Sequence, residues 1–274
     1  MRLGACILGT MASFEHSEGG SDTINVSEAS QRPEFLAEKL VARVTLMRHE
    51  ETEYTGVGRD ITERGLVRAT EVGESITHEK GAPRVIGTSP KPRAVGTGLS
   101  VEEGVQHADP EASPARWITV PGLQATKFRD PEIHNDLTQK YGGDQAAWAE
   151  AHYDDPEFYN NPDKLESNEE KRSRMYRELE RLVFSLEKQE TTDEVPHLVF
   201  VSHYELLTLL LDDVFGIQTF GTPNTPTFGE HVDIELYQPD EHDAIPIRIQ
   251  FRDHQAFVLF DRELRRLVAT PASP

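Results

Sequence analysis

Four basic side chains stand where short apolar strands are expected to end. Arg48 and His49 follow the run VARVTLM, His203 ends the run HLVFVSH, and Arg93 lies just beyond the run RVIGTS. In open parallel sheets, ligands bind beyond the carboxyl ends of the strands, where loops turn into helices. Two imidazoles and two guanidiniums, far apart in the chain, are therefore expected to converge at one rim of a sheet.

Such a set suits the binding and transfer of a phosphoryl dianion. Guanidinium groups bind phosphate oxygens with two-pronged geometry and stay charged at every working pH. A neutral imidazole, whose unperturbed pKa is about 6.5, can accept a phosphoryl group, and a second, protonated imidazole can stabilise the charge that moves during transfer. Because the positive charge resides in side chains, we expect neither a metal ion nor a cofactor.

Short apolar strands alternate with amphipathic helices along most of the chain. This alternation predicts an α/β fold, a three-layer α/β/α sandwich whose central sheet is mainly parallel. The last quarter, with DIELYQ, IPIRIQ and AFVLF, predicts added antiparallel strands, and RELRRL at 262–267 predicts a closing helix. Before that quarter, strands are expected at 41–47, 84–89, 117–122 and 197–203, and helices at 62–77, 168–188 and 204–216.

The chain of 274 residues is expected to divide into an arm and one domain. Residues 1–32 are rich in Ser, Glu and Gly and lack periodicity, which predicts a disordered or loosely attached N-terminal arm. The domain is expected over 33–274, because that length allows one substantial core. Within it, 123–166 is predicted to be an insertion that forms a lid over the pocket.

Composition limits the partners and the compartment. The formal net charge of -20 disfavours binding to nucleic acid or to anionic lipid, and no apolar run is long enough to span a membrane. The single cysteine, Cys6, has no partner for an intrachain disulfide and suits a reducing, cytoplasmic setting, and MRLGACILGTMA resembles an export signal only briefly. A small phosphorylated substrate is the expected partner, and the oligomeric state does not follow from the sequence.

Four stretches of the sequence resemble those of one known family, in the same order. RHEETEYT at 48–55 is similar to an Arg-His-Gly-x-Thr motif with Asn three residues on, and DITERGLVRA at 60–69 to a Leu-Thr-x-x-Gly stretch leading into Gln-Ala. TSPKPRAVGTG at 88–98 is similar to a Ser-x-x-x-Arg-Ala-x-x-Thr segment, and VFVSHYELL at 199–207 to a late strand ending in Ser-His. On these motifs the chain resembles the histidine phosphatase superfamily, the phosphoglycerate mutase-like proteins.

The resemblance implies a role for each basic residue. It implies that His49 is the phosphorylated nucleophile, that Arg48 and Arg93 clamp the phosphate, and that His203 is the second histidine of the pocket. Thr55 stands where family members often use Asn to touch the phosphate, and its hydroxyl can still donate one hydrogen bond.

Glu50, Tyr204 and Ala125 also depart from the family pattern. Glu50 replaces the glycine after the nucleophile, so its carboxylate would either repel a dianion or point away harmlessly into solvent. Tyr204 replaces the glycine after the late histidine, which makes the pocket wall bulkier and more aromatic. Ala125 occupies the place of the Glu that protonates the leaving group, and alanine cannot donate a proton.

Other carboxylates are candidates for the missing general acid. Asp130 and Glu132, in FRDPEIHND, rank level and first; the others are Glu51, Asp136 and Glu205. Substrates with good leaving groups, such as acyl or aryl phosphates, would need the acid least.

The sequence therefore predicts a phosphatase that hydrolyses small phosphomonoesters through a phosphohistidine on His49. Two alternatives stay open. A cofactor-dependent phosphoglycerate mutase is weakened because the extended Glu-Arg-His-Tyr-Gly stretch typical of those mutases is missing. A degenerate member that binds a phosphorylated ligand without turnover is supported by Ala125 and Glu50, and opposed by the intact histidines and arginines.

Overall fold

Eight strands and the helices around them make up the part of the chain that a computed structural model describes, residues 39–53, 58–130, 132–141, 163–187, 194–216, 225–239 and 244–269. The strands are β1 Leu40–Arg48, β2 Val85–Thr88, β3 Arg116–Thr119, β4 His197–Ser202, β5 His231–Tyr237, β6 Ile245–Phe251, β7 His254–Asp261 and β8 Arg266–Ala269. The helices are α1 Glu63–Lys80, α2 Pro92–Ala108, the 3-10 turn η2 Pro121–Leu123, α3 Glu132–Tyr141, α6 Asn168–Glu187 and α7 Tyr204–Phe215.

The strands form one sheet in the order β3-β2-β4-β1-β5-β6-β7-β8. Neighbours from β3 to β1 run parallel, and every pair from β1 to β8 is antiparallel. The α/β fold is thus confirmed. The prediction of a mainly parallel sheet is confirmed only in part, because the parallel pairs are confined to the half of the sheet that carries the Arg-His pair. The antiparallel strands expected in the last quarter are present as β5, β6 and β7.

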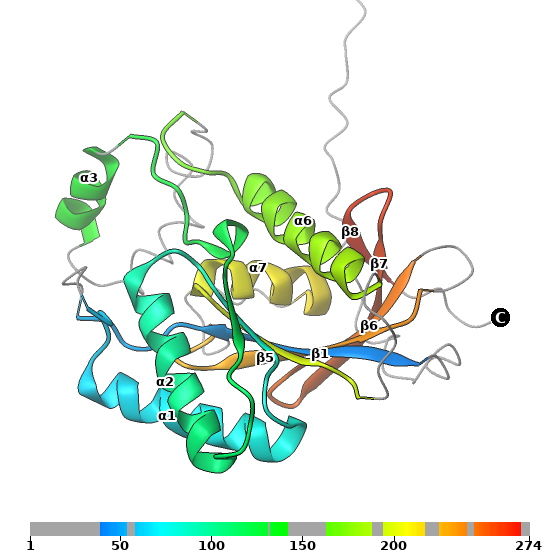
Figure 1. The fold of residues 1–274 in the computed structure, drawn as a ribbon. Helices are drawn as coiled ribbons and strands as arrows, with labels where there is room; N and C mark the ends of the chain where they lie inside the picture. The colour runs from blue at the N-terminus through cyan, green and yellow to red at the C-terminus, as the bar shows by residue number, and fades with distance from the viewer. Residues whose placement is uncertain are drawn as a thin grey trace, which may run out of the picture.

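Alternate residues of the central strands face two helical layers. Val44 and Leu46 of β1 pack with side chains from α6 and α7, whereas Met47 packs in a second core with side chains from α1 and α2. Figure 1 shows the two pairs of helices on opposite sides of the sheet. This is the predicted three-layer arrangement, and it explains why β4, with every residue of HLVFVS buried, lacks polar alternation.

Glycines bring α1 and α2 close together on their side of the sheet. A Cβ atom on Gly73 would lie 2.1 Å from the carbonyl oxygen of Val101, and one on Gly104 would lie 2.0 Å from that of Thr70. Both positions therefore admit no side chain while the helices keep this approach. The packing fixes α2, whose first turn carries Arg93, relative to α1.

The closing helix expected at 262–267 is absent, and that prediction is wrong. Residues 262–265 form a turn between β7 and β8, in which Arg265 has φ 50° and the Leu264 amide donates to the Asp261 carboxylate at 2.8 Å. Without β8, the outer edge of β7 would expose unpaired backbone amides and carbonyls. Pairing with β8 gives these groups hydrogen-bond partners. Leu267 is buried in the core as a strand residue.

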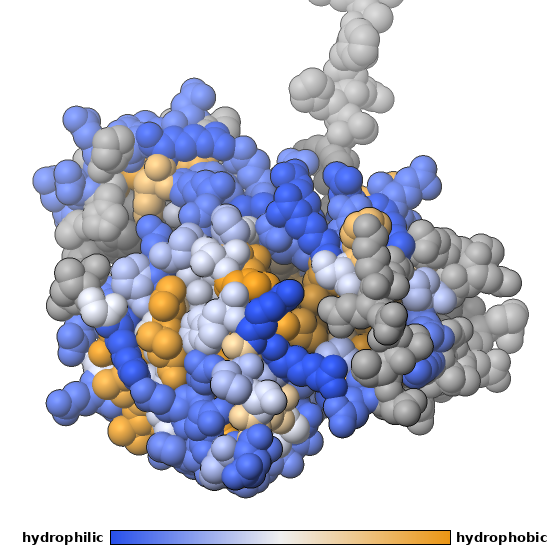
Figure 2. All heavy atoms as spheres, viewed as in Figure 1, coloured by the Kyte–Doolittle hydropathy of each residue, from blue (hydrophilic) through white to orange (hydrophobic). Residues whose placement is uncertain are grey.

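The arm at 1–32 lies outside the described residues, and so do 131 and 142–162 of the segment predicted to be a lid. The described part of that segment begins at the last residue of η2 and holds α3, and an isolated bridge joins Phe128 to Leu165. Figure 2 shows hydrophilic side chains over most of the visible described surface, with smaller apolar patches between them. None of the helices with described residues is both long and apolar enough to cross a membrane.

Candidate active site

Two neighbouring parallel strands bring the two histidines together. β1 and β4 pair so that Arg48 stands opposite Ser202, and the amide of His49 donates to the carbonyl of Ser202 at 3.0 Å. His203, which follows β4 directly, therefore lies beside His49. The two ring centroids are 5.0 Å apart, and both side chains are almost completely buried.

Arg93 joins them from the first turn of α2. Its Nε donates to His49 Nε2 at 3.1 Å, and its Nη2 lies 3.5 Å from His203 Nδ1. Thr97 ties this turn to the end of β1, because its hydroxyl donates to the carbonyl of Arg93 and accepts from the amide of Glu50 at 2.9 Å. One guanidinium thus spans two imidazoles that are 154 positions apart in sequence.

Arg48, next to His49 in sequence, is buried against two aromatic rings. Its guanidinium carbon lies 3.9 Å from the ring centre of Phe228 and 5.0 Å from that of Tyr204, and its Nη1 donates to the carbonyl of Pro226 at 2.6 Å. These contacts hold the cation in place at low dielectric. Tyr204 is therefore part of the aromatic wall that was expected from its sequence position.

The hydrogen bonds of His49 select its tautomer. Its Nδ1 lies 2.7 Å from the carbonyl oxygen of Glu50, which can only accept, so Nδ1 carries the proton and Nε2 presents a lone pair. Burial, and then the charge of Arg93, lower the pKa of His49 well below its usual value. The ring is consequently a neutral imidazole near pH 7, as a nucleophile requires.

His203 is also held as a neutral ring. Because the Arg93 guanidinium can only donate to Nδ1, the proton resides on Nε2, which lies 2.8 Å from the hydroxyl of Ser89. Burial, and then the neighbouring His49 and Arg93, lower the pKa of His203. The protonated form expected from the sequence therefore needs a bound anion to stabilise it.

The family model of the histidine phosphatase superfamily (branch 1) matches residues 44–234, most of the described domain. The chain belongs to this superfamily. No curated protein matches the sequence.

Solved structures agree with this membership of the histidine phosphatase superfamily. Mycobacterial hydrolase 1 has a TM-score of 0.55 at 19% identity and covers 79% of this chain and 100% of its own. Mycobacterial hydrolase 2 has a TM-score of 0.55 at 18% identity, with 83% and 96% covered. The mycobacterial glucosyl-3-phosphoglycerate phosphatase has a TM-score of 0.52 at 19% identity, with 77% and 98% covered. At these identities the likeness establishes the fold.

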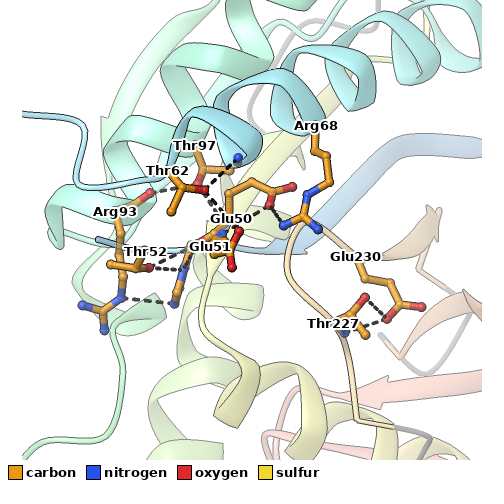
Figure 3. Close-up of polar contacts among 11 residues, drawn as sticks. Glu50, Glu51, Thr52, Thr62, Arg68, Arg93, Thr97, Thr227 and Glu230 are labelled. Atoms are coloured by element: carbon orange, nitrogen blue, oxygen red, sulfur yellow. Dashed lines mark hydrogen bonds and ion pairs between the residues drawn. The ribbon is translucent and has the colours of Figure 1, made fainter. Parts of the chain in front are cut away.

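Glu50, the first departure of this superfamily member from the family pattern, points away from the imidazoles but not into solvent. Its carboxylate is buried, and its Oε2 accepts from Nη2 of Arg68, on α1, at 2.6 Å. Figure 3 shows the side chain extended towards Arg68, on the side opposite Arg93. Of the two alternatives left open by the sequence, the solvated carboxylate is excluded, and an ion pair with Arg68 compensates the charge inside the protein.

Ala125 lies in a segment fixed beside the end of β4. The Ser202 hydroxyl donates to the carbonyl of Leu123 at 2.8 Å, and Arg174 of α6 donates to the carbonyls of Gly122 and Ala125. Arg174 also forms a buried pair with Glu166 at 2.7 Å. The segment that would carry the general acid in other members is thus held rigidly in this superfamily member, without a carboxylate at residue 125.

The candidate acids and Thr55 complete the predicted set. Asp130 accepts from the amide of Glu132 at 2.9 Å, and Glu132 is the exposed first residue of α3. Among the residues that the structure describes, no hydrogen bond or ion pair joins either carboxylate to His49, Arg93 or His203. Their role as acid stays a prediction, and Thr55 lies outside the described residues.

Three site residues were missed by sequence reasoning. Ser89 contacts His203, and Pro226 and Phe228 contact Arg48. Ser89 is the first residue of the Ser-x-x-x-Arg segment in the third family-like stretch. That position could have identified it as a site residue. Pro226 and Phe228 lie in a loop before β5 that resembles no motif, so only the three-dimensional fold places them.

Proposed function

We propose that this protein is a phosphatase that hydrolyses small phosphomonoesters through a phosphohistidine on His49. One observation carries the proposal: a single guanidinium, Arg93, lies within 3.1 Å of His49 and 3.5 Å of His203. A phosphoryl group is the ligand whose oxygens satisfy such a guanidinium while its phosphorus faces an imidazole lone pair.

The reaction has two steps. In the first, His49 Nε2 attacks phosphorus, an N–P bond forms, and the P–O bond to the leaving group breaks, while Arg48 and Arg93 bind the remaining oxygens. For this, Arg93 must exchange its present bond to Nε2 for bonds to phosphate. In the second step, water attacks the phosphohistidine, the N–P bond breaks, and inorganic phosphate leaves with the neutral imidazole restored.

The leaving oxygen needs a proton that Ala125 cannot give. We propose that Asp130 or Glu132 supplies it, because both follow the segment that carries Ala125. General acid catalysis contributes typically ~10²–10⁴-fold, and an aryl phosphate gains least from it. Phosphomonoesters with good leaving groups therefore depend least on this acid.

The decisive experiment uses an aryl phosphate. His49→Ala is expected to lose hydrolysis, and the wild-type protein is expected to form an acid-labile phosphohistidine that rapid quenching traps. The matched control is His78→Ala, an exposed histidine on α1, which should keep wild-type turnover. Full activity of His49→Ala would overturn the proposal.

A second candidate function, binding of a phosphorylated ligand without turnover, is favoured by Ala125 alone. It predicts that phosphate and the aryl phosphate bind, with the ester recovered unchanged after long incubation. The partner in both cases is a small phosphorylated molecule. A neighbour in structure, the mycobacterial glucosyl-3-phosphoglycerate phosphatase, supports that size class. The single cysteine supports a cytoplasmic setting.

A further inference from the structure

The residue after the nucleophile has an unusual environment for a carboxylate. Glu50 is completely buried, with 0% of its surface exposed, yet its Oε2 has a guanidinium partner in Arg68, 2.6 Å away. Burial raises the pKa of Glu50, and the Arg68 charge opposes that rise. A buried carboxylate is costly to retain without such a partner, so the pair is a built feature of the site.

The surrounding chain is shaped to hold this carboxylate. A Cβ atom on Gly229 would lie 1.9 Å from Glu50 Oε1, and Gly229 has φ +75°, so glycine suits this position in two ways. Gly229 follows Phe228, whose ring contacts His49 and Arg48. The carboxylate therefore fills the space between α1, the end of β1 and the loop that covers the imidazole.

One peptide group connects the carboxylate to the nucleophile. The amide of Glu51 lies 3.3 Å from Glu50 Oε2, and the carbonyl of the same peptide group accepts the Nδ1 proton of His49 at 2.7 Å. The hydrogen bonds thus run from Arg68 to the Glu50 carboxylate, from there through the peptide group, and on to the imidazole. An anion at the amide end polarises the carbonyl and makes it a stronger acceptor.

We propose that Glu50 is a positioning residue for His49: with Arg68 it fixes and polarises the peptide group that retains the Nδ1 proton, which keeps Nε2 available for attack. The inference rests on the proposed function, since it assigns Glu50 a purpose only if His49 is the nucleophile. Both members of the pair depart together from the family stretches quoted above, where glycine stands at 50 and glutamine at 68.

The test compares two substitutions of graded effect. Glu50→Met keeps the length of the side chain but removes its acceptor, and Glu50→Gln keeps a neutral acceptor of the same shape. Glu194→Gln is the control, because it breaks the exposed pair with Arg84 beyond the amino-terminal end of β2. Arg68→Met keeps the Glu50 carboxylate but removes its cationic partner, so it disturbs the same series of hydrogen bonds.

Nitrogen-15 NMR of the unliganded protein reads the tautomer of His49 directly. The wild-type ring is expected to carry its proton on Nδ1, and Glu50→Met to show a mixture of tautomers, with Glu50→Gln in between and Glu194→Gln unchanged. In turnover, kcat should fall about tenfold or more in Glu50→Met, by analogy with misplaced catalytic groups and wrong tautomers. KM should change by less than about twofold, because the phosphate clamps keep their contacts.

An unaltered tautomer and an unaltered kcat in folded Glu50→Met would overturn the inference. If Glu50→Met does not fold, Glu50→Gln and Arg68→Met carry the same comparison, and wild-type tautomer and kcat in both would overturn it equally. The tautomer is read without turnover, so this failure differs from that of the proposed function, which full activity of His49→Ala reveals.

Discussion

Burial and positive charge act in the same direction on the two imidazoles. Burial is the largest cause of the lowered pKa in both rings, and Arg93 adds to it in both. The neutral form that nucleophilic attack requires is therefore the stable one in His49 near pH 7. A phosphate dianion beside His203 has the opposite effect, because it favours the protonated ring.

We predict that neither ring takes up a proton near the usual histidine pKa of about 6.5, and that saturating phosphate raises the pKa of His203. Nitrogen-15 NMR of both rings, titrated with and without phosphate, measures the two effects. A His203 ring whose pKa does not respond to bound phosphate would show that the anion binds elsewhere.

At the residue scale, the predictable part of the site was the part attached to regular elements. Arg48 is the last residue of β1, and His49 and His203 directly follow strands. Strand ends meet at one rim whatever the loops do. The partner of Glu50 was not predictable, because an isolated carboxylate gives no sign of whether a cation faces it. Phe228 was equally hidden, since nothing in its loop distinguishes a residue that covers the imidazole from one exposed to water.

At the element scale, the close approach of α1 and α2 joins the two sources of site residues. Arg68 comes from α1 and Arg93 from α2, and their helices meet at glycines whose missing side chains leave room for backbone contact. The distance between the helices therefore decides whether both arginines reach the end of β1.

We predict that Gly104→Ala destabilises the protein by roughly 1–3 kcal/mol, because its Cβ would meet the Thr70 carbonyl at 2.0 Å and force the helices apart. Activity should fall with it, since Arg93 moves with α2. Urea unfolding and aryl phosphate turnover measure the two effects. Glu71→Ala, on the exposed face of α1, is the control and should stay within about 0.5 kcal/mol. Wild-type stability in Gly104→Ala would mean that the helices separate at little cost.

The elements themselves were predicted where burial is continuous and missed where it is not. β1, β2 and β4 lie at the expected apolar runs, because a parallel strand covered on both faces needs such a run. The segment at 262–267 has apolar and charged residues at a spacing that also suits a helix. The segment instead forms a turn and a strand because β8 pairs with the edge of β7. The local sequence contains no sign of that edge.

At the scale of the whole molecule, buried neutral histidines couple stability to pH. His197, at the opposite end of β4 from His203, donates to the carbonyl of Gly81 and contacts the Thr45 hydroxyl, and burial lowers its pKa to about 4. Unfolding returns it to a pKa of about 6.5, so the unfolded chain binds a proton that the folded one refuses. The contribution of neutral His197 to the free energy of unfolding is therefore fully present above about pH 6.5, and it is lost as the pH falls towards 4.

We predict that His197→Asn, which can keep the donor to Gly81, weakens this dependence by about 1.4 kcal/mol per pH unit between about pH 6.5 and about pH 4.5. Urea unfolding of both proteins at several pH values in that range measures the slopes, and their difference cancels the contribution of the carboxylates that both share. Gly104→Ala serves as the control, because it should lower stability without changing the slope. Equal slopes in the wild-type protein and His197→Asn would show that the folded protein already accepts the proton, and that the interior around β4 is more polar than its contacts indicate.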